Sequence, residues 1–474
     1  MDARPSRTRT ASPDDVETLT RLAGPKGVVA GPDRDPHLEE WRGRWRGEAP
    51  VILAPERTET LSTLLAYCHE HGLAVVPQGG NTGLVGGQVP GGEVLVSTKR
   101  MRRVRAVSAE DFTITAEAGV TLAEVQAAAE GASRLFPLSI GSEGTCNVGG
   151  ILSTNAGGVS VLRYGSARDL TLGLEVVLPD GRVWNGLNAL RKNNTGYDLK
   201  SLFVGAEGTL GIITAAVLKL SPRPAERVTA MLAVPDAGAA VRLLGLAQER
   251  SGGGVTSFEL MSRETIDLVL THFSGLARPP GQTPFSCLVE FAAGTRGTLR
   301  PLVDALVESA FEDGLVVDGT VAESDAQAHA LWAIRHGASE AMKRDPSPCV
   351  KCDVSVPIRR VPGFLRDADA AVARAAPGAR IIAFGHVGDG NIHYDVLGPE
   401  GQDPAAWRGR MGEIERLVHD VAHAHEGSIS AEHGIGQLKR AEMAERADPV
   451  ALDLMRAVKR AVDPGGLMNP GKLL

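Results

Sequence analysis

Three histidines and one glutamate, in two glycine-flanked motifs, are the residues of this chain best suited to chemistry. His386 and His393 lie seven residues apart in the run His-Val-Gly-Asp-Gly-Asn-Ile-His, and Glu432 and His433 adjoin in Ser-Ala-Glu-His-Gly-Ile-Gly. Two imidazoles and a carboxylate suit zinc or a similar divalent ion that keeps one position open for a substrate. The alternative is a set of hydrogen-bonded histidines in tight turns, which explains one such motif more readily than two.

A second group of residues suits the recognition of an anion. Arg335 and Ser339 are four residues apart in an expected helix and therefore share one face of it. Lys351 precedes an apparent strand at 353–356. Arginine makes a forked pair with a carboxylate, and lysine adds a point charge. The alternative is that both cations are solvated on the surface.

Two glycine-rich stretches must position any cofactor. Residues 141–158 contain six glycines among short polar side chains, which suits a large, flat group held through the main chain. Residues 77–84, Pro-Gln-Gly-Gly-Asn-Thr-Gly-Leu, follow the expected strand 73–76. They match neither the dinucleotide fingerprint nor the phosphate-binding loop with its lysine. Consecutive glycines can still form an anion-binding nest, so we expect a pyrophosphate cradle of another kind.

Together these stretches resemble the FAD-binding core of the vanillyl-alcohol oxidase family. Within that family the chain is similar to the FAD-linked D-2-hydroxyacid dehydrogenases of the D-2-hydroxyglutarate and D-lactate type, from about Val51 to Leu474. Residues 202–214 and the Asn-Pro-Gly-Lys ending at 469–472 belong to the same likeness. The resemblance implies that FAD is contacted by Pro77, Gly79, Gly80, Asn81, Thr82, Gly83, Leu84, Gly141, Ser142, Gly144, Thr145, Asn147, Gly150, Asn155, Gly157, Gly211, Ile213 and Asn469.

The resemblance also implies roles for the residues described first. The divalent metal, zinc by this resemblance, would be bound by His386, His393 and Glu432. The catalytic base would be His433. An imidazole suits proton transfer near neutral pH. Arg335, Ser339 and Lys351 would meet the distal carboxylate of a dicarboxylic substrate. The implied reaction converts a D-2-hydroxyacid to a 2-oxoacid, with the hydride going to flavin N5 and the electrons passing to an electron-transfer flavoprotein or a quinone.

Two features, at Asp395 and in the segment before Lys351, depart from the pattern of those dehydrogenases. Asp395 stands where they usually carry asparagine, two residues after the second metal histidine. The segment before Lys351 carries Pro346 and Pro348 and is about one residue longer. The first glycine loop has no histidine, so covalent attachment of the flavin is not expected there.

Other functions remain open at this stage. One is an oxygen-using oxidase of similar substrates, and another is a flavin-binding subunit or carboxylate-binding module without catalysis of its own. A metal-free mechanism would use His433, with arginine and lysine alone holding the carboxylate. The chain shows no nicotinamide site and no iron–sulfur motif.

The expected fold class is α+β: a two-subdomain FAD-binding domain of the vanillyl-alcohol oxidase type and an α+β substrate domain. We expect the FAD domain at 1–222, the substrate domain with the metal site at 223–445, and a C-terminal segment at 446–474 that returns to the FAD domain. Pro222-x-Pro224 marks the first boundary. Expected elements are strands at 50–55, 73–76, 94–97, 112–116, 172–178, 229–234, 286–291 and 381–384, and helices at 58–71, 122–129, 236–250, 297–312 and 359–375.

Composition excludes several classes of function. The chain has 474 residues and a net charge of −7, so no nucleic-acid partner is expected. It contains no run of eighteen apolar residues, so no transmembrane helix is expected. Its start has no apolar core and is therefore not a secretory signal; it is arginine-rich, faintly like a transit peptide, but we expect an irregular terminus instead. Five sparse cysteines, with Cys349 and Cys352 as an incidental pair, favour a reducing compartment. We therefore expect a cytoplasmic enzyme, and a homodimer is compatible with the sequence.

Overall fold

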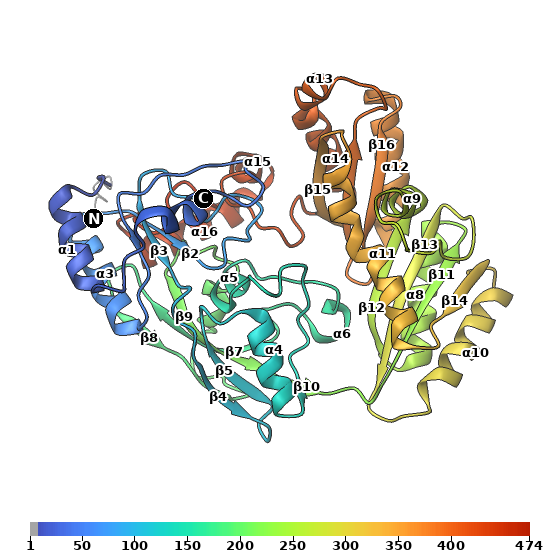
Figure 1. Ribbon diagram of the computed structural model, residues 1–474, viewed down its shortest axis with the longest axis horizontal. Coiled ribbons are helices and arrows are strands. Elements are labelled where there is room, and N and C mark those ends of the chain that lie inside the picture. Colours follow the sequence, from blue (N-terminus) through green and yellow to red (C-terminus); the bar gives the residue numbers. More distant parts are fainter. Residues whose placement is uncertain (1–7) are drawn as a thin grey trace. The chain divides into compact units, whose positions relative to one another are not determined.

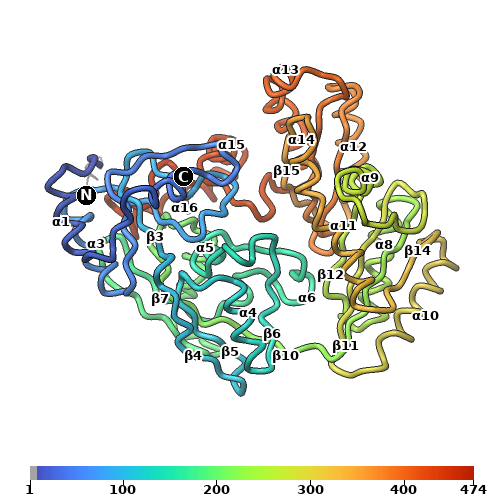
Figure 2. The backbone as a smooth tube through the Cα atoms, in the orientation of Figure 1, coloured from blue at the N-terminus to red at the C-terminus, as the bar shows by residue number. Residues whose placement is uncertain are grey.

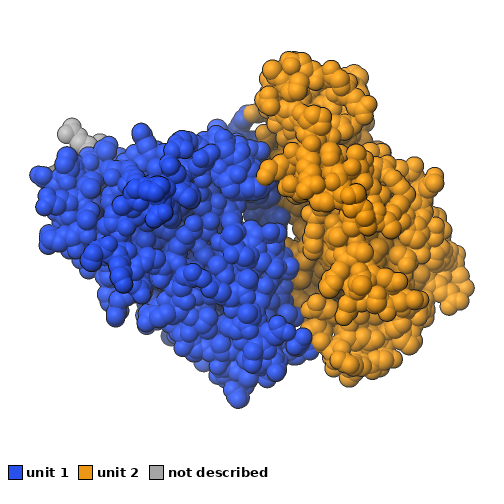
Figure 3. All heavy atoms as spheres, viewed as in Figure 1, with its two compact units in different colours: residues 1–157, 166–223, 432–474 blue, residues 158–165, 224–431 orange. Residues whose placement is uncertain are grey.

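The computed structural model describes residues 8–474, and the chain forms two compact units (Figure 3). Unit 1 comprises Met1–Gly157, Ser166–Arg223 and Glu432–Leu474, and unit 2 comprises Gly158–Gly165 and Pro224–Ala431. This division differs from our expectation in two places, since unit 1 resumes at Glu432 rather than at 446, and the short segment 158–165 belongs to unit 2. The expected irregular terminus includes residues 1–7, which lie outside the described residues.

The first layer of unit 1 is a small parallel sheet with strand order β1-β3-β2 (Figure 1). Helix α3 connects β1 to β2, and it buries Leu61, Leu64, Leu65 and Cys68, the set expected from helical spacing. It ends at Gly72, whose φ of 66° is the left-handed conformation that a helix end requires. The elements of this part are α1 (Pro13–Ala23), η1 (Gly31–Arg34), α2 (Asp35–Leu38), β1 (Ile52–Leu53), α3 (Thr58–His71), β2 (Val75–Gln78) and β3 (Val94–Ser97).

The second layer of unit 1 is a five-stranded antiparallel sheet with order β4-β5-β9-β7-β8. Helix α4 begins at a capping box formed by Thr121 and Glu124. The six-residue helix α5 lies in the central glycine stretch, where no helix was among the expected elements. The elements are β4 (Val104–Ser108), β5 (Thr113–Glu117), α4 (Leu122–Gly131), β6 (Arg134–Leu135), α5 (Val148–Ser153), β7 (Thr171–Val177), β8 (Val183–Asn185), α7 (Lys200–Phe203), β9 (Ile212–Lys219) and β10 (Ser221–Pro222).

The C-terminal segment completes unit 1 (Figure 2, red end of the tube). Helices α15 (Arg440–Arg446) and α16 (Pro449–Val462) precede a tail that runs beside β2. The Val75 N–H donates to the Leu467 carbonyl at 2.9 Å, and the Asn469 N–H donates to the Val75 carbonyl at 2.8 Å. These two bonds hold the Asn-Pro-Gly-Lys ending directly beside the strand that leads into the first glycine loop.

Unit 2 is built on a seven-stranded antiparallel sheet with order β14-β11-β13-β12-β16-β17-β15 (Figure 1). Two separate apolar cores show that α8, α10, α12 and α14 cover one face, while α9 and α11 cover the other. The elements are α6 (Val161–Tyr164), β11 (Glu226–Val234), α8 (Ala237–Ser251), β12 (Val255–Ser262), α9 (Arg263–His272), β13 (Phe285–Ala293), α10 (Leu299–Glu312), β14 (Asp318–Val321), α11 (Asp325–Arg344), β15 (Cys349–Ser355), η2 (Ile358–Arg360), α12 (Val361–Ala375), β16 (Arg380–His386), β17 (Asn391–Leu397), α13 (Pro404–Arg408) and α14 (Met411–Ala424).

Neither β12 nor β17 was expected from the sequence. Every residue of β12 is buried, so the strand lacks the alternation of apolar and polar residues that identifies a half-exposed strand. Among residues 8–474, no helix is both long and apolar enough to cross a membrane.

Candidate active site

In unit 1, the two glycine-rich stretches are in contact with two further segments, the 205–211 run and the C-terminal tail. A Cβ atom at Gly80 would lie 2.2 Å from the carbonyl oxygen of Thr145, and one at Gly208 would lie 2.3 Å from the ring of Pro77. The Asn469 amide donates to the carbonyl oxygens of Gly87, at 3.0 Å, and Glu207, at 2.8 Å. The first loop, the central stretch, the 205–211 run and the C-terminal tail therefore form one continuous backbone surface, where side chains at the contact points would not fit.

This surface has the properties of a cofactor cradle. Buried amide oxygens of Asn81, Asn147 and Asn469 have no hydrogen-bond partner among the described residues. Beside Gly144 and Gly150, a Cβ atom would meet nothing within 4 Å. Buried polar atoms normally have partners, so three unpaired acceptors on these segments indicate that a polar-edged group completes the site. The residues present therefore fit FAD.

The other expected flavin residues have different surroundings. Asn155, at a φ of 51°, accepts hydrogen bonds from Ser166 Oγ at 3.1 Å and the Arg168 N–H at 2.9 Å, so it also shapes its own loop. Ile213 is buried in β9, and a Cβ at Gly211 would lie 2.8 Å from the Val177 carbonyl oxygen. The remaining expected residues lie on the same glycine-rich segments: Gly79, Thr82, Gly83, Leu84, Gly141, Ser142 and Gly157.

The two histidines of the first motif lie on a β-hairpin, not on one glycine-rich turn as we expected. His386 is the last residue of β16, and His393 lies within β17. Strand register places a carboxylate opposite each of them: Glu259 of β12 is paired with His386, and Asp353 of β15 is paired with His393. Directly paired residues of antiparallel strands are close enough for their side chains to interact.

Glu259 is a buried residue of the site that sequence analysis missed. Its Oε1 lies 2.6 Å from Nδ1 of His386, and its Oε2 accepts a hydrogen bond from Nε of Arg335 at 2.6 Å. Burial by itself raises the pKa of Glu259, but the charges and hydrogen bonds of His386 and Arg335 outweigh it and lower the pKa to about 2. Glu259 is therefore a buried carboxylate that joins two of the predicted site residues.

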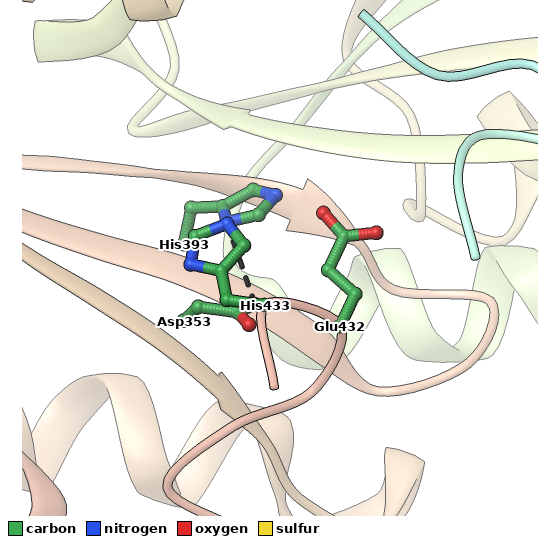
Figure 4. Close-up of side chains that lie close together, drawn as sticks. All are labelled: Asp353, His393, Glu432 and His433. Carbon is green, nitrogen blue, oxygen red and sulfur yellow. Dashed lines mark ion pairs between the residues drawn. The ribbon is translucent and has the colours of Figure 1, made fainter. Parts of the chain in front are cut away.

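Four side chains that can ligate a metal lie close together, one each on β15 and β17 and two on the loop that follows Ala431 (Figure 4). One ligand atom from each of Asp353, His393, Glu432 and His433 lies within 4.8 Å of the others. The Ala431 N–H donates to the Asp353 carbonyl at 3.3 Å, so the residues that directly follow Ala431 begin beside β15. The structure thus brings three of the four predicted residues together and adds Asp353.

His386 is not in that group of four, but it is adjacent to it. Its ring centroid lies 5.7 Å from that of His393, in an edge-on arrangement. Nδ1 of His386 lies 2.6 Å from Oε1 of Glu259, and Nδ1 of His393 lies 3.7 Å from Oδ1 of buried Asp353, which is longer than a hydrogen bond. A carboxylate at Nδ1 orients an imidazole so that Nε2 coordinates, which is the usual surrounding of metal-binding histidines. The donor set therefore fits a divalent metal.

The predicted substrate residues differ in exposure. Arg335 is 8% exposed and stacks over the Phe384 ring, 4.7 Å from its centre, whereas Ser339 on the same helix is exposed. Lys351 is paired across the sheet with Asp395, with 3.8 Å between Nζ and Oδ2. Asp395 also accepts the Cys352 N–H at 3.1 Å. The unusual aspartate thus faces the lysine.

Comparison with known proteins agrees with this geometry. Sequence models of two families match: the FAD binding domain at residues 49–186 and the C-terminal domain of FAD linked oxidases at residues 223–473. The solved structure of p-cresol methylhydroxylase shares the fold, with a TM-score of 0.75 at 15% identity over 97% of this chain and 96% of that one. The chain is thus an α+β flavoprotein of the vanillyl-alcohol oxidase type.

Two curated relatives narrow the class. D-2-hydroxyglutarate dehydrogenase, mitochondrial, of Bos taurus is 38% identical over 466 residues, which is 98% of this chain and 84% of the relative. D-2-hydroxyglutarate dehydrogenase of Xanthomonas citri pv. viticola is 36% identical over 443 residues, or 93% and 92% of the two chains. The chain belongs to the FAD-dependent D-2-hydroxyacid dehydrogenases of the FAD linked oxidase family.

The comparisons correct the expected cytoplasmic location. The relatives from Bos taurus and Arabidopsis thaliana are both named as mitochondrial proteins, so the cytoplasmic prediction is wrong. It rested on the absence of an apolar signal and on sparse cysteines. Neither criterion detects import into an organelle, since transit peptides are arginine-rich and amphipathic instead of apolar.

Proposed function

We propose that the chain oxidises D-2-hydroxyglutarate, or a D-2-hydroxyacid of similar shape, to the 2-oxoacid. The observation that carries the proposal is the buried guanidinium of Arg335, which shares Glu259 with the metal-site candidate His386. A dicarboxylic substrate has a hydroxyacid end for the metal and a second carboxylate for the arginine. The names of the Bos taurus and Xanthomonas relatives support the same substrate. D-Lactate, which lacks the second carboxylate, would be a poorer substrate.

FAD would be held by the glycine-rich surface of unit 1, with the amide oxygens of Asn81, Asn147 and Asn469, which have no partner among the described residues, at its polar edges. When bound, FAD supplies the acceptor for the hydride that leaves the substrate carbon. Binding would be non-covalent at the first loop, because that loop contains no histidine.

A divalent metal, zinc by the resemblance, would be held by His386, His393 and Glu432. When bound, such an ion lowers the pKa of the substrate hydroxyl. His433 would then take the hydroxyl proton, because its imidazole adjoins Glu432 in the chain and lies in the same group of ligand atoms. Asp353 would hold His393 in place through Nδ1.

At the other end of the substrate, Arg335 would bind the distal carboxylate. Nε is the only nitrogen of Arg335 that donates a hydrogen bond within residues 8–474, so the two Nη groups remain for a forked pair with an anion. Lys351 would add positive charge, reduced by Asp395, and exposed Ser339 would contribute a hydroxyl.

The deciding experiment is a panel of D-2-hydroxyacids mixed anaerobically with the purified protein, with loss of flavin absorbance as the readout. We expect the fastest reduction with D-2-hydroxyglutarate and slower reduction with D-lactate. Equal rates for both would contradict the substrate proposal, and no reduction by any D-2-hydroxyacid would favour a non-catalytic flavin subunit.

Exposing the reduced protein to air then tests the oxygen-using alternative. We expect slow reoxidation by oxygen and fast reoxidation by an electron-transfer flavoprotein or a quinone analogue. Fast reoxidation by oxygen alone would identify an oxidase.

A further inference from the structure

We propose that Glu259 is a positioning residue that couples metal binding to recognition of the substrate's distal carboxylate. The inference rests on the proposed function, since it takes His386 as a metal ligand and Arg335 as the carboxylate-binding residue. It goes beyond that function because it assigns one buried carboxylate to both tasks.

The geometry leaves each oxygen of Glu259 with one task. Oε1 lies 2.6 Å from Nδ1 of His386, and Oε2 lies 2.6 Å from Nε of Arg335. The Glu259 side chain is fully buried, so bulk water does not reach either oxygen. A short hydrogen bond to a buried carboxylate is strong, and it restricts the rotation of both partners.

On the metal side, Glu259 selects the coordinating nitrogen. A carboxylate at Nδ1 requires the proton to be on that nitrogen, which directs the lone pair of Nε2 toward a ligand. The register of β12 and β16 places Glu259 directly opposite His386, so the contact depends on the sheet and not on a mobile loop.

On the substrate side, Glu259 orients the guanidinium. It occupies the Nε edge of Arg335, and the ring of Phe384 lies 4.7 Å from the guanidinium carbon. Since one edge and one face are held, the Nη edge is the part that can meet a planar carboxylate in a forked pair. The Arg335 side chain is therefore already ordered before substrate binds, which lowers the entropy cost of binding a dicarboxylate.

The coupling predicts a distinct result for Glu259→Gln. Glutamine keeps the size of the side chain, but it replaces one acceptor with an NH₂ donor, which faces either Nε–H of Arg335 or Nδ1–H of His386. Relative to wild type, the holoenzyme variant should lose bound zinc to a chelator about 10- to 100-fold more readily. Its KM for D-2-hydroxyglutarate should rise by at least tenfold more than its KM for D-lactate.

Single variants separate the two halves of the coupling. Arg335→Ala should keep its zinc while losing the preference for the dicarboxylate, and His386→Ala should lose zinc. Asp345→Asn is the matched control, because Asp345 is also a buried carboxylate of unit 2, paired with Arg380 at 2.8 and 2.9 Å. This control should change neither zinc retention nor substrate preference.

The inference is tested by two measurements on each variant: the zinc content, and the ratio of KM for D-2-hydroxyglutarate to KM for D-lactate. If folded Glu259→Gln keeps both at wild-type values, or loses only one of them, the coupling is refuted. If it fails to fold, Glu259→Asp replaces it, because the shorter carboxylate cannot span both partners at 2.6 Å and should show the same two losses. A wild-type protein with no zinc or no dicarboxylate preference would instead refute the proposed function.

Discussion

Both carboxylate oxygens of Glu207 accept backbone hydrogen bonds from the loop that follows His433: Oε1 from the Ile435 N–H and Oε2 from the Gly436 N–H, each at 2.7 Å. The loop is tightly packed, since a Cβ at Gly436 would lie 2.3 Å from the Val85 carbonyl oxygen. Burial raises the pKa of Glu207, although the two N–H groups oppose this shift. A partly buried carboxylate thus holds the backbone two and three residues after the proposed base His433.

Glu207→Gln should therefore misplace His433. Glutamine offers one oxygen to two N–H donors, so one end of the loop loses its acceptor. We expect flavin reduction at saturating D-2-hydroxyglutarate to slow by about tenfold or more, because small displacements of a catalytic group are costly. Stopped-flow reduction measures this rate. Glu130→Gln, at an exposed carboxylate of the same unit, is the control and should reduce at the wild-type rate.

Gly150→Ala tests where FAD binds. The space beside Gly150 is open in the protein, and alanine favours the helix α5 by about 1 kcal/mol over glycine. The FAD-free variant should therefore melt at or above the wild-type temperature but bind FAD more weakly, because the added methyl group enters the cradle. Gly131→Ala, also a helical glycine with open space beside it, is the control. Unchanged FAD affinity in Gly150→Ala would place the cofactor elsewhere.

Arg335→Ala should discriminate between substrates. Loss of a charge-assisted pair costs about 1.5–3 kcal/mol, which is roughly ten- to over a hundredfold in kcat/KM. We expect that loss for D-2-hydroxyglutarate and a much smaller one for D-lactate, measured by steady-state kinetics with an artificial acceptor. An equal loss for the two substrates would remove Arg335 from the distal-carboxylate role.

His433→Ala should separate proton transfer from metal binding. The variant should retain FAD and metal while its flavin is reduced about 10²- to 10⁴-fold more slowly, the usual effect of losing a general base. His393→Ala should instead lose both metal and activity. Elemental analysis and anaerobic stopped-flow reduction measure the two effects. Should chelators remove the metal from the wild type without slowing reduction, the arginine- and lysine-based mechanism would replace the metal-assisted one.

Arg105 links two buried carboxylates of unit 1 and makes stability depend on pH. It donates to Glu117 at 3.2 Å and to Glu175 at 2.9 and 3.1 Å. Burial alone raises the pKa of both glutamates, but hydrogen bonds, chiefly from Arg103 and Arg105 to Glu117 and from Arg105 to Glu175, lower both pKa values below the ordinary 4.5. The stabilisation is therefore complete above about pH 4.5 and is lost as the pH falls through the lowered values.

Arg105→Met should accordingly destabilise unit 1 by about 3 kcal/mol at pH 7, because it leaves the buried carboxylate of Glu175 without its cation, while Glu117 keeps Arg103. The difference in Tm from wild type should shrink as the pH is lowered from 5 to 3. Arg46→Met removes an exposed pair with Asp35 and should have little effect at either pH. A pH-independent difference for Arg105→Met would attribute its effect to packing instead.

Local features were accessible to sequence analysis because their physical causes are local. Glycines in 77–84 and 141–158 predicted where backbone would approach a ligand, and these two stretches contain the buried Asn81 and Asn147 amide oxygens without described partners and the open space beside Gly144 and Gly150. Helix α3 followed from apolar spacing and a terminal glycine. The general reaction class followed from the resemblance and is confirmed by the relatives.

Strand register, which the sequence did not predict, determines which side chains of the metal and substrate sites face one another. Glu259, in the run Val-Thr-Ser-Phe-Glu-Leu-Met-Ser, has no flanking glycine and no chemical neighbour in the sequence. Its partners His386 and Arg335 are 127 and 76 residues away. Only the pairing of β12 with β16, and of β15 with β17, sets Glu259 opposite His386, Asp353 opposite His393 and Asp395 opposite Lys351. A shift of one residue would turn each side chain to the other face, and that choice depends on the packing of the whole sheet.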